Sequence, residues 1–303
     1  MPVPLSGTTV SLAAGPCRAS IASVGASLRE LLYDGRDLVL PYAKDQVRPN
    51  YRGATLVPWP NRVVDGRYRW DGSEHQLALT EPARGHALHG LGAWLDYDVV
   101  EKTESAALLR AMIPAQDGYP FALEISTSWR LDEHGLHCEV TALNVGDADA
   151  PFGTGPHPYL VAGEGRVDDW SVTIPAASVL TVTEDRLIPI GLSPVGGTEF
   201  DFRSHRGIGD TFIDHAFTDL ERRDGIAEVR LTAASGTGVA MTWDGACPWV
   251  QVHTADQPVV ADSRLGLAVE PMTCPPDAFN SGTDLIRLAP GEQSSASWSI
   301  RAL

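Results

Sequence analysis

The stretch LEISTSWRLDEHGLHCEVTALNV, residues 123–145, shows most directly how the chain folds. Apolar side chains or a threonine occupy every second position in two runs, and the turn-forming residues DEHG separate the runs. Alternation with a period of two is typical of strands that bury one face. The stretch therefore predicts an antiparallel hairpin. Its buried face would hold Leu123, Ile125, Thr127, Trp129, Leu131, Leu136, Cys138 and Val140.

The same alternation occurs elsewhere, whereas helical spacing is nearly absent. Ala296, Trp298 and Ile300 alternate with polar residues near the C-terminus, and short apolar runs such as 177–182 fit the same pattern. The 29 glycines and 22 prolines divide the chain into short segments, and no linker or repeat stands out. We expect one all-β domain over residues 1–303, built as a large sandwich or barrel.

Composition and charge argue against several classes of function. A chain of 303 residues that is 43% hydrophobic can bury a full core. Its net charge of −16 disfavours nucleic acid and anionic membrane as partners. No apolar run approaches the roughly 18 to 20 residues that span a bilayer. The N-terminal segment MPVPLSGTTV also lacks the features of a signal peptide. These features predict a cytoplasmic protein.

The four cysteines, Cys17, Cys138, Cys247 and Cys274, lie far apart and form no C-x-x-C pair. This spacing argues against a thiolate zinc site or thioredoxin-like redox chemistry. We expect reduced thiols packed in the core, because free cysteine is among the most buried residue types.

Five stretches interrupt the strand pattern with polar residues among glycines, prolines and aromatic residues. We expect each at a strand end or in a loop, where a rigid sheet presents binding residues. They are PWPNRVVDGRY (58–68), GHALHG (85–90), GTGPHPYL (153–160), DHAFTD (214–219) and VEPMTCPPDAF (269–279).

Taken singly, the polar residues of these stretches have structural as well as functional interpretations. Arg62 could be a surface arginine, and Asp214 could cap a turn or pair with its neighbour. His157 lies between two prolines, whose fixed φ suits a histidine that must be aimed, although a core histidine is the alternative. Glu270 follows an apolar run, so burial would raise the pKa of its carboxyl group unless a partner offsets it. Either function or a salt bridge must explain a buried carboxylate there.

The pair His86 and His89 has a spacing that resembles a metal site. The metalloprotease version needs a glutamate beside the first histidine and a helix, whereas here the pair lies in a glycine-bounded loop. The sequence therefore predicts no metal site, and the absence of a phosphate-cradling glycine loop predicts no cofactor.

Together the five stretches suit a polyhydroxylated substrate. A carboxylate base and a histidine acid on opposite sides of a pocket can move protons in both directions. An arginine, a second histidine and an aspartate can then hold hydroxyl groups.

In order and spacing, the motifs NRVVDGRY, LHG, GPHPYL, DHAF and VEP…PDAF resemble those of the aldose 1-epimerase (galactose mutarotase) family. The resemblance runs from about residue 58 to the C-terminal strand. It implies a large antiparallel β-sandwich, the galactose mutarotase-like supersandwich. It also implies an isomerase that interconverts the α and β anomers of free sugars such as galactose and glucose.

The resemblance also implies roles for individual residues. The general base falls on Glu270 and the general acid on His157, whereas Arg62, His89 and Asp214 would bind sugar hydroxyls. We add two candidate substrate-binding residues, Asn61 beside Arg62 and Gln251 in PWVQVHT, and the tryptophans Trp59 and Trp249 could stack on the sugar ring. The chain departs from the common pattern beside this site, since Leu91 follows LHG and the histidine motif reads HPYLVAG. These departures bear on which sugar is preferred.

Three alternatives remain open. A hexose 6-phosphate mutarotase would need a cluster of cations, for which Arg62, Arg67, Arg69 and Arg84 are candidates. A catalytically silent sugar-binding protein could keep the pocket without the chemistry. A glycoside hydrolase could use Asp214 and Glu270 as its two carboxylates, but His157 would then have no duty. Oligomeric state is not readable from the sequence.

Overall fold

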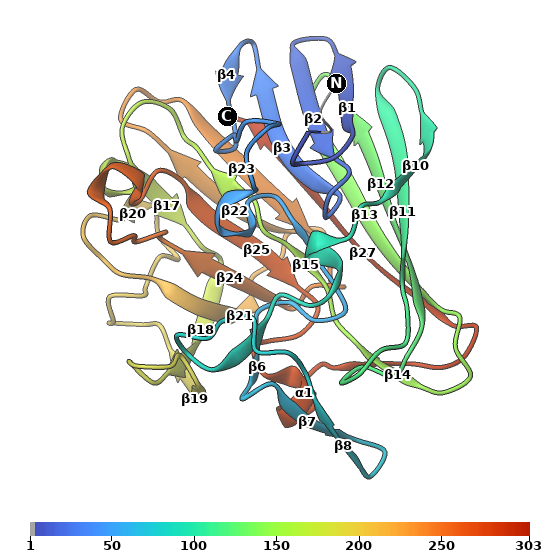
Figure 1. Ribbon diagram of the computed structural model, residues 1–303. Coiled ribbons are helices and arrows are strands. Elements are labelled where there is room, and N and C mark those ends of the chain that lie inside the picture. Colours follow the sequence, from blue (N-terminus) through green and yellow to red (C-terminus); the bar gives the residue numbers. More distant parts are fainter. Residues whose placement is uncertain (1–3) are drawn as a thin grey trace.

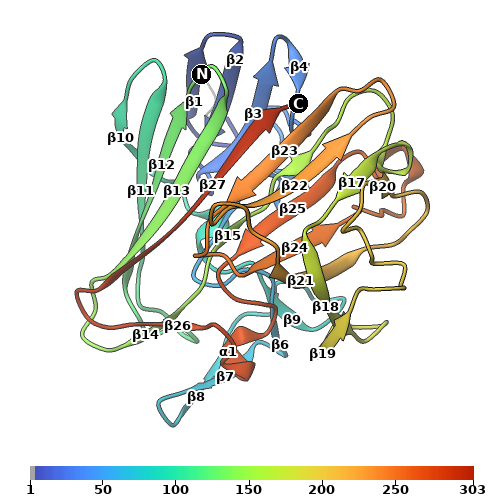
Figure 2. The same cartoon turned by 180° about the vertical axis from the view of Figure 1, so that it is seen from behind.

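The computed structural model describes residues 4–303, which form an antiparallel β-sandwich (Figures 1 and 2). Residues 1–3, the start of the segment used above to argue against a signal peptide, lie outside the described residues. The all-β fold class is confirmed. Among residues 4–303, no helix is long and apolar enough to cross a membrane.

The larger layer is a nine-stranded antiparallel sheet. In spatial order its strands are β10 (Asp98–Lys102), β11 (Ala106–Ile113), β12 (Leu123–Leu131), β13 (Gly135–Asn144), β27 (Gln293–Ala302), β23 (Gly238–Trp243), β22 (Ala227–Thr232), β17 (Ser171–Thr173) and β20 (Arg206–Gly207).

The smaller layers are a six-stranded and a four-stranded sheet. The six-stranded sheet has the order β16 (Tyr159–Leu160), β25 (Leu267–Met272), β24 (Trp249–His253), β21 (Asp214–Leu220), β18 (Ala176–Val182) and β19 (Pro189–Pro194). The four-stranded sheet has the order β1 (Thr9–Ala14), β2 (Cys17–Ala22), β3 (Ser27–Tyr33) and β4 (Arg36–Asp37), and its first two strands contact β11 and β12.

Short strand pairs and turns complete the fold. The pairs are β14 (Ala150–Phe152) with β26 (Ile286–Leu288), β15 (Gly155–Pro156) with β5 (Thr55–Leu56), β6 (Arg62–Val64) with β9 (His86–Leu88), and β7 (Arg67–Trp70) with β8 (Ser73–Gln76). The helical segments are α1 (Ala278–Ser281) and four 3₁₀ turns, Pro49–Tyr51, Gly92–Trp94, Val167–Asp169 and Val260–Asp262. The β7–β8 hairpin projects from the body of the molecule (Figure 1).

The hairpin expected from residues 123–145 is present as β12 and β13. Leu123 pairs with Asn144 and Leu131 with Leu136, and the side chains alternate between buried and partly exposed along β12. The predicted alternation at the C-terminus is also confirmed, because every second side chain of β27 around Trp298 is buried.

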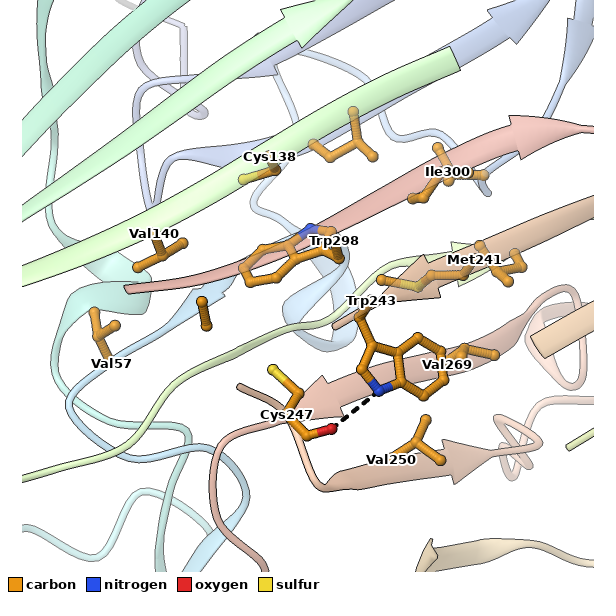
Figure 3. Packing of buried hydrophobic residues seen from close by; sticks show 14 of the residues in the cluster. Val57, Cys138, Val140, Met241, Trp243, Cys247, Val250, Val269, Trp298 and Ile300 are labelled. Atoms are coloured by element: carbon orange, nitrogen blue, oxygen red, sulfur yellow. Dashed lines mark hydrogen bonds between the residues drawn. The ribbon is translucent and has the colours of Figure 1, made fainter. Parts of the chain in front are cut away.

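The core lies between the sheets and is continuous. Trp298 and Met241 of the nine-stranded sheet face Val250 and Val269 of the six-stranded sheet, as Figure 3 shows. The indole N–H of Trp243 donates to the carbonyl of Cys247 over 3.1 Å, so this buried polar group is satisfied. All four cysteines are buried and free, as expected.

Candidate active site

One wall of the candidate site is formed by three neighbouring strands of the six-stranded sheet. Gln251 of β24 lies opposite Glu270 of β25, and His253 of β24 lies opposite Asp214 of β21. Because side chains alternate along a strand, the valines beside Gln251 enter the core, and Gln251 itself points to the other face. The strand registers therefore bring residues from three separate parts of the chain to one face of the sheet.

Two of the five polar stretches run along strands of this sheet instead of lying at strand ends or in loops, although Asp214 itself is at a strand end. Asp214 is the first residue of β21, and the DHAFTD stretch runs along that strand. Glu270 lies inside β25, which continues through Pro271 to Met272. The short strand β16 pairs only with the first two residues of β25, so Pro271 lies where the strand is paired on one side. Proline is tolerated at such a position, because the other side carries no ladder hydrogen bonds.

The opposite wall is built by the β6–β9 pair. Arg62 pairs with Leu88, and the N–H of His89 donates to the carbonyl of Asn61 over 2.8 Å. Asn61 and His89 both have positive φ, 52° and 61°, a region sparsely used by residues other than glycine. Strain of this kind persists only where the surrounding structure holds it, and it gathers at functional sites. The pairing brings the NR and LHG motifs, well separated in sequence, side by side.

His157 reaches the site from the short loop between β15 and β16. Its N–H donates to the carbonyl of Ala54 over 3.0 Å, and its carbonyl accepts from the N–H of Gly53 over 2.7 Å. The ring of His157 stacks on Tyr159 at a centroid distance of 5.1 Å and meets the ring of His89 edge-on at 4.9 Å. Backbone and ring contacts thus aim this histidine, as the flanking prolines suggested.

All seven predicted site residues line one cavity of about 480 Å³, a size usual for small-molecule sites. The lining comprises Asn50, Tyr51, Asn61, Arg62, Glu81, Arg84, Leu88, His89, His157, Tyr159, Phe212, Asp214, Gln251, His253, Asp256, Gln257, Pro258 and Glu270.

At the centre of the cavity lies the pair formed by Glu270 and His157. Oε1 of Glu270 is 3.5 Å from Nε2 of His157, and the side chains are only 2% and 6% exposed. Burial raises the pKa of Glu270 well above its usual value, and the negative charge of Asp214 adds to this effect. Burial, together with the charge of His253, lowers the pKa of His157 to about 3. Both shifts favour the uncharged form of each group, so together they favour the arrangement in which Glu270 carries the proton of the pair.

Asp214 is charged and partly bonded. Burial alone would raise its pKa, but the positive charges of His253 and Arg62 hold the pKa below its usual value. Oδ1 of Asp214 accepts from Nε2 of Gln251 over 2.7 Å, whereas Oδ2 lies 3.7 Å from Nη2 of Arg62, too far for a hydrogen bond. One oxygen of this carboxylate is therefore left for a ligand.

Five residues of the cavity carry a buried polar atom without a hydrogen-bond partner. They are Nε of Arg84, Nδ1 of His89, Nδ1 of His157, Oε1 of Gln251 and Oε2 of Glu270. An unpaired buried polar group costs free energy, and proteins contain few of them. A ligand with several hydroxyl groups is the kind of molecule that could satisfy such a set.

Several lining residues were not identified from the sequence. His253 could have been found, since it lies two positions beyond Gln251 on the same strand face. Tyr51 and Glu81 gave no comparable signal, because segments distant in sequence bring them to the cavity. Tyr51 packs on the ring of His89 at 4.6 Å and lies 6.5 Å from the ring of His157.

The two tryptophans expected to stack on a sugar ring are not in the cavity, and that expectation is wrong. Trp59 is in the core, where it packs on Phe279 at 5.4 Å. Trp249 is buried farther along β24, and its indole N–H donates to Asp284 over 2.7 Å. Both indoles pack inside the protein and do not form a surface on which a sugar ring could stack.

The four candidate arginines do not converge. Arg62 and Arg84 line the cavity, and both are bonded to Glu81, at 2.7 Å and 2.9 Å. Arg67 and Arg69 lie on the β7–β8 hairpin beside a separate hollow. The cavity thus has no cluster of unpaired arginines.

Residues 4–303 hold no group of three or more His, Cys, Asp or Glu side chains placed to bind a metal ion. His86, the partner of His89 in the metal-like spacing, is fully buried and bonds to the carbonyl of Arg186 over 2.9 Å. It is not among the cavity residues.

Residues 8–301 match the family model described as Aldose 1-epimerase, and the chain belongs to this family. The chain is 39% identical over 289 residues to the uncharacterized protein YihR of Escherichia coli (strain K12), covering 95% of this chain and 91% of YihR. It is 29% identical over 232 residues to human galactose mutarotase, covering 70% and 66% of the two chains.

Solved structures show the same fold. A putative aldose 1-epimerase from E. coli K12 superposes with a TM-score of 0.84 at 23% identity, covering 98% of this chain and 99% of the other. A GalM/aldose epimerase homologue from C. elegans superposes with a TM-score of 0.86 at 18% identity, covering 98% of each chain. At these identities the likeness supports the fold alone.

Proposed function

We propose that this protein is a mutarotase that interconverts the α and β anomers of a free hexose such as glucose or galactose. The observation that carries the proposal is the buried pair of Glu270 and His157, 3.5 Å apart, in which burial raises the pKa of the first and lowers the pKa of the second. Ring opening needs one group to accept a proton and another to donate one, and this pair can do both.

In the proposed mechanism Glu270 accepts the proton of the anomeric hydroxyl while His157 donates a proton to the ring oxygen. The C1–O5 bond breaks, which gives an open-chain aldehyde with a hydroxyl at C5. The aldehyde rotates about C1–C2, the C5 hydroxyl attacks the other face, and both protons return. Each such group typically contributes on the order of 10²- to 10⁴-fold in rate.

The pKa shifts of the pair fit this cycle. Once the ring has opened, Glu270 carries a proton and His157 is neutral, which is the arrangement that the two shifts favour. The cyclic sugar requires the other arrangement, with the proton on His157. The two atoms are 3.5 Å apart, beyond the usual length of a hydrogen bond, so a substrate hydroxyl between them would carry the proton from one group to the other.

The remaining cavity residues would orient the sugar. Arg62 and Asn61 offer donors, Asp214 offers a free oxygen, and His89 and Gln251 each offer an unpaired atom. Galactose mutarotase is the name of relatives in human and rat, which supports a hexose as the substrate of this chain. The buried thiols are compatible with a cytoplasmic enzyme of hexose metabolism.

The test is the optical rotation of freshly dissolved α-D-glucose and α-D-galactose with the purified protein. We expect rapid relaxation with wild type and relaxation at the uncatalysed rate with Glu270→Gln and with His157→Asn. If the wild-type protein accelerates the relaxation of none of the free hexoses, this result contradicts the proposal. The same assay on glucose 6-phosphate then separates a phosphosugar enzyme from a silent sugar-binding protein.

A further inference from the structure

Glu81 is a cavity residue with no role in the mechanism above. It lies in the turn between β8 and β9, and its carbonyl accepts hydrogen bonds from the N–H groups of Arg84, Gly85 and His86, at 3.1, 2.8 and 3.3 Å. These hydrogen bonds fix the backbone of the turn, and therefore the direction in which the Glu81 side chain leaves it. That side chain lines the cavity and is 12% exposed.

The carboxylate of Glu81 accepts two hydrogen bonds from the guanidinium of Arg62. Oε2 accepts from Nε over 2.7 Å, and Oε1 accepts from Nη2 over 3.1 Å. Oε1 also accepts from Nη1 of Arg84 over 2.9 Å. Two parallel bonds between an arginine and a carboxylate fix orientation as well as distance. The hydrogen bonds and charge of Arg62 accordingly keep the pKa of Glu81 below its usual value, against the effect of burial.

On its other side, Arg62 faces Asp214 across a gap. Nη2 lies 3.7 Å from Oδ2 of Asp214, and Oδ1 is already bonded to Gln251. Arg62 thus lies between two carboxylates, each 12% exposed, and is bonded to only one of them. Attraction between opposite charges in such a setting would close the gap if the first carboxylate were absent.

We propose that Glu81 is a positioning residue that holds Arg62 away from Asp214. The gap keeps a donor on Arg62 and an acceptor on Asp214 available side by side, so one sugar hydroxyl can accept from the first and donate to the second. A direct Arg62–Asp214 bond would occupy the facing atoms, Nη2 and Oδ2, with each other. This inference rests on the proposed function, since it assumes that a sugar occupies the cavity.

The test compares Glu81→Gln with wild type in the mutarotase assay. Glutamine has the same shape but only one side-chain oxygen and no charge, so it cannot accept two parallel hydrogen bonds from the guanidinium of Arg62. We expect KM to rise roughly tenfold, the order of one hydrogen bond to a charged group, with kcat changed far less. The control is Glu74→Gln, which removes a carboxylate from the exposed Arg69–Glu74 pair and should change neither constant.

A double-mutant cycle separates positioning from a merely structural role. If Glu81 acts by keeping Arg62 off Asp214, Glu81→Gln should have a much smaller effect on KM in an Asp214→Asn background. An equal effect in both backgrounds, or a Glu81→Gln enzyme with wild-type KM, overturns the inference. Calorimetric titration with galactose gives dissociation constants for the same proteins. An inactive wild type would refute the proposed function, whereas the binding data would still decide the role of Glu81.

Discussion

At the scale of single residues, the site depends on groups whose proton affinities are shifted in opposite directions. Glu270 and His157 are both buried, and burial favours the uncharged form of each. The carboxyl group therefore keeps its proton to a higher pH, and the imidazole loses its proton at a lower pH, than either would in water. Both shifts thus favour a pair that holds a single proton, as reversible ring opening requires.

These two shifts predict a pH profile with one limb set by each group. We expect kcat/KM to fall on the acid side only near a pH of about 3. There His157 is protonated while Glu270 also carries a proton, so the pair holds two protons. On the alkaline side kcat/KM should fall at a pH well above 4.5, where Glu270 loses the proton. The profile is measured by polarimetry, with circular dichroism at each pH to confirm that the protein is folded. An acid limb near pH 6.5 would show that His157 titrates normally and would refute the assignment.

At the scale of elements, the 3₁₀ turn Pro49–Tyr51 supports both histidines. Asn50 and Tyr51 have consecutive positive φ values of 47° and 55°, and the carbonyl of Asn50 accepts from the hydroxyl of Tyr159 over 3.0 Å. A bulky residue at positive φ is uncommon. The strained turn places the Tyr51 ring against His89 and near His157.

Replacement of this ring should loosen the histidines. Tyr51→Ala keeps a side chain with a Cβ at the same φ, so the comparison isolates the loss of the ring. We expect kcat to fall roughly tenfold or more, because small displacements of catalytic groups cost rate steeply. Tyr51→Phe should retain most of the activity, since the ring remains. Equal activity of the alanine variant and wild type would show that the ring positions neither histidine.

The strands of this fold could be predicted from the sequence more readily than the contacts between them. Period-two alternation predicted β12, β13 and β27, because a strand that buries one face alternates apolar and polar side chains along its own sequence. Contacts such as that of Glu81 with Arg62 join a turn to a strand from another part of the sequence, and no local pattern encodes them. The same limit explains the error at Trp59 and Trp249, since a tryptophan near a motif can serve the core as well as the site.

At the scale of the whole molecule, one continuous set of buried side chains joins the sheets. Trp298 of β27 lies within it and is 5% exposed. The single domain expected from the sequence stays a prediction, and it can be tested through this core. A shared core should make the three sheets unfold together.

We expect Trp298→Ala to lower the free energy of unfolding by about 3–5 kcal/mol, the usual cost of removing a large buried aromatic side chain. Urea denaturation followed by fluorescence and by circular dichroism should give one coincident transition in both proteins. Ser297→Ala, on the other face of the same strand, is the control and should stay within about 0.5 kcal/mol of wild type. Two separate transitions would show that the sheets form independent units.

The register between β24 and β25 has a consequence for how this protein can change over time. A deletion of one residue in either strand would turn Gln251 or Glu270 into the core and bring a valine to the cavity. The turn at the tip of the projecting β7–β8 hairpin, residues 71–72, carries no such constraint, since it lies outside the paired strands and holds none of the seven predicted site residues. Changes of length are therefore open to selection in this turn, whereas β24 and β25 can change only by substitution.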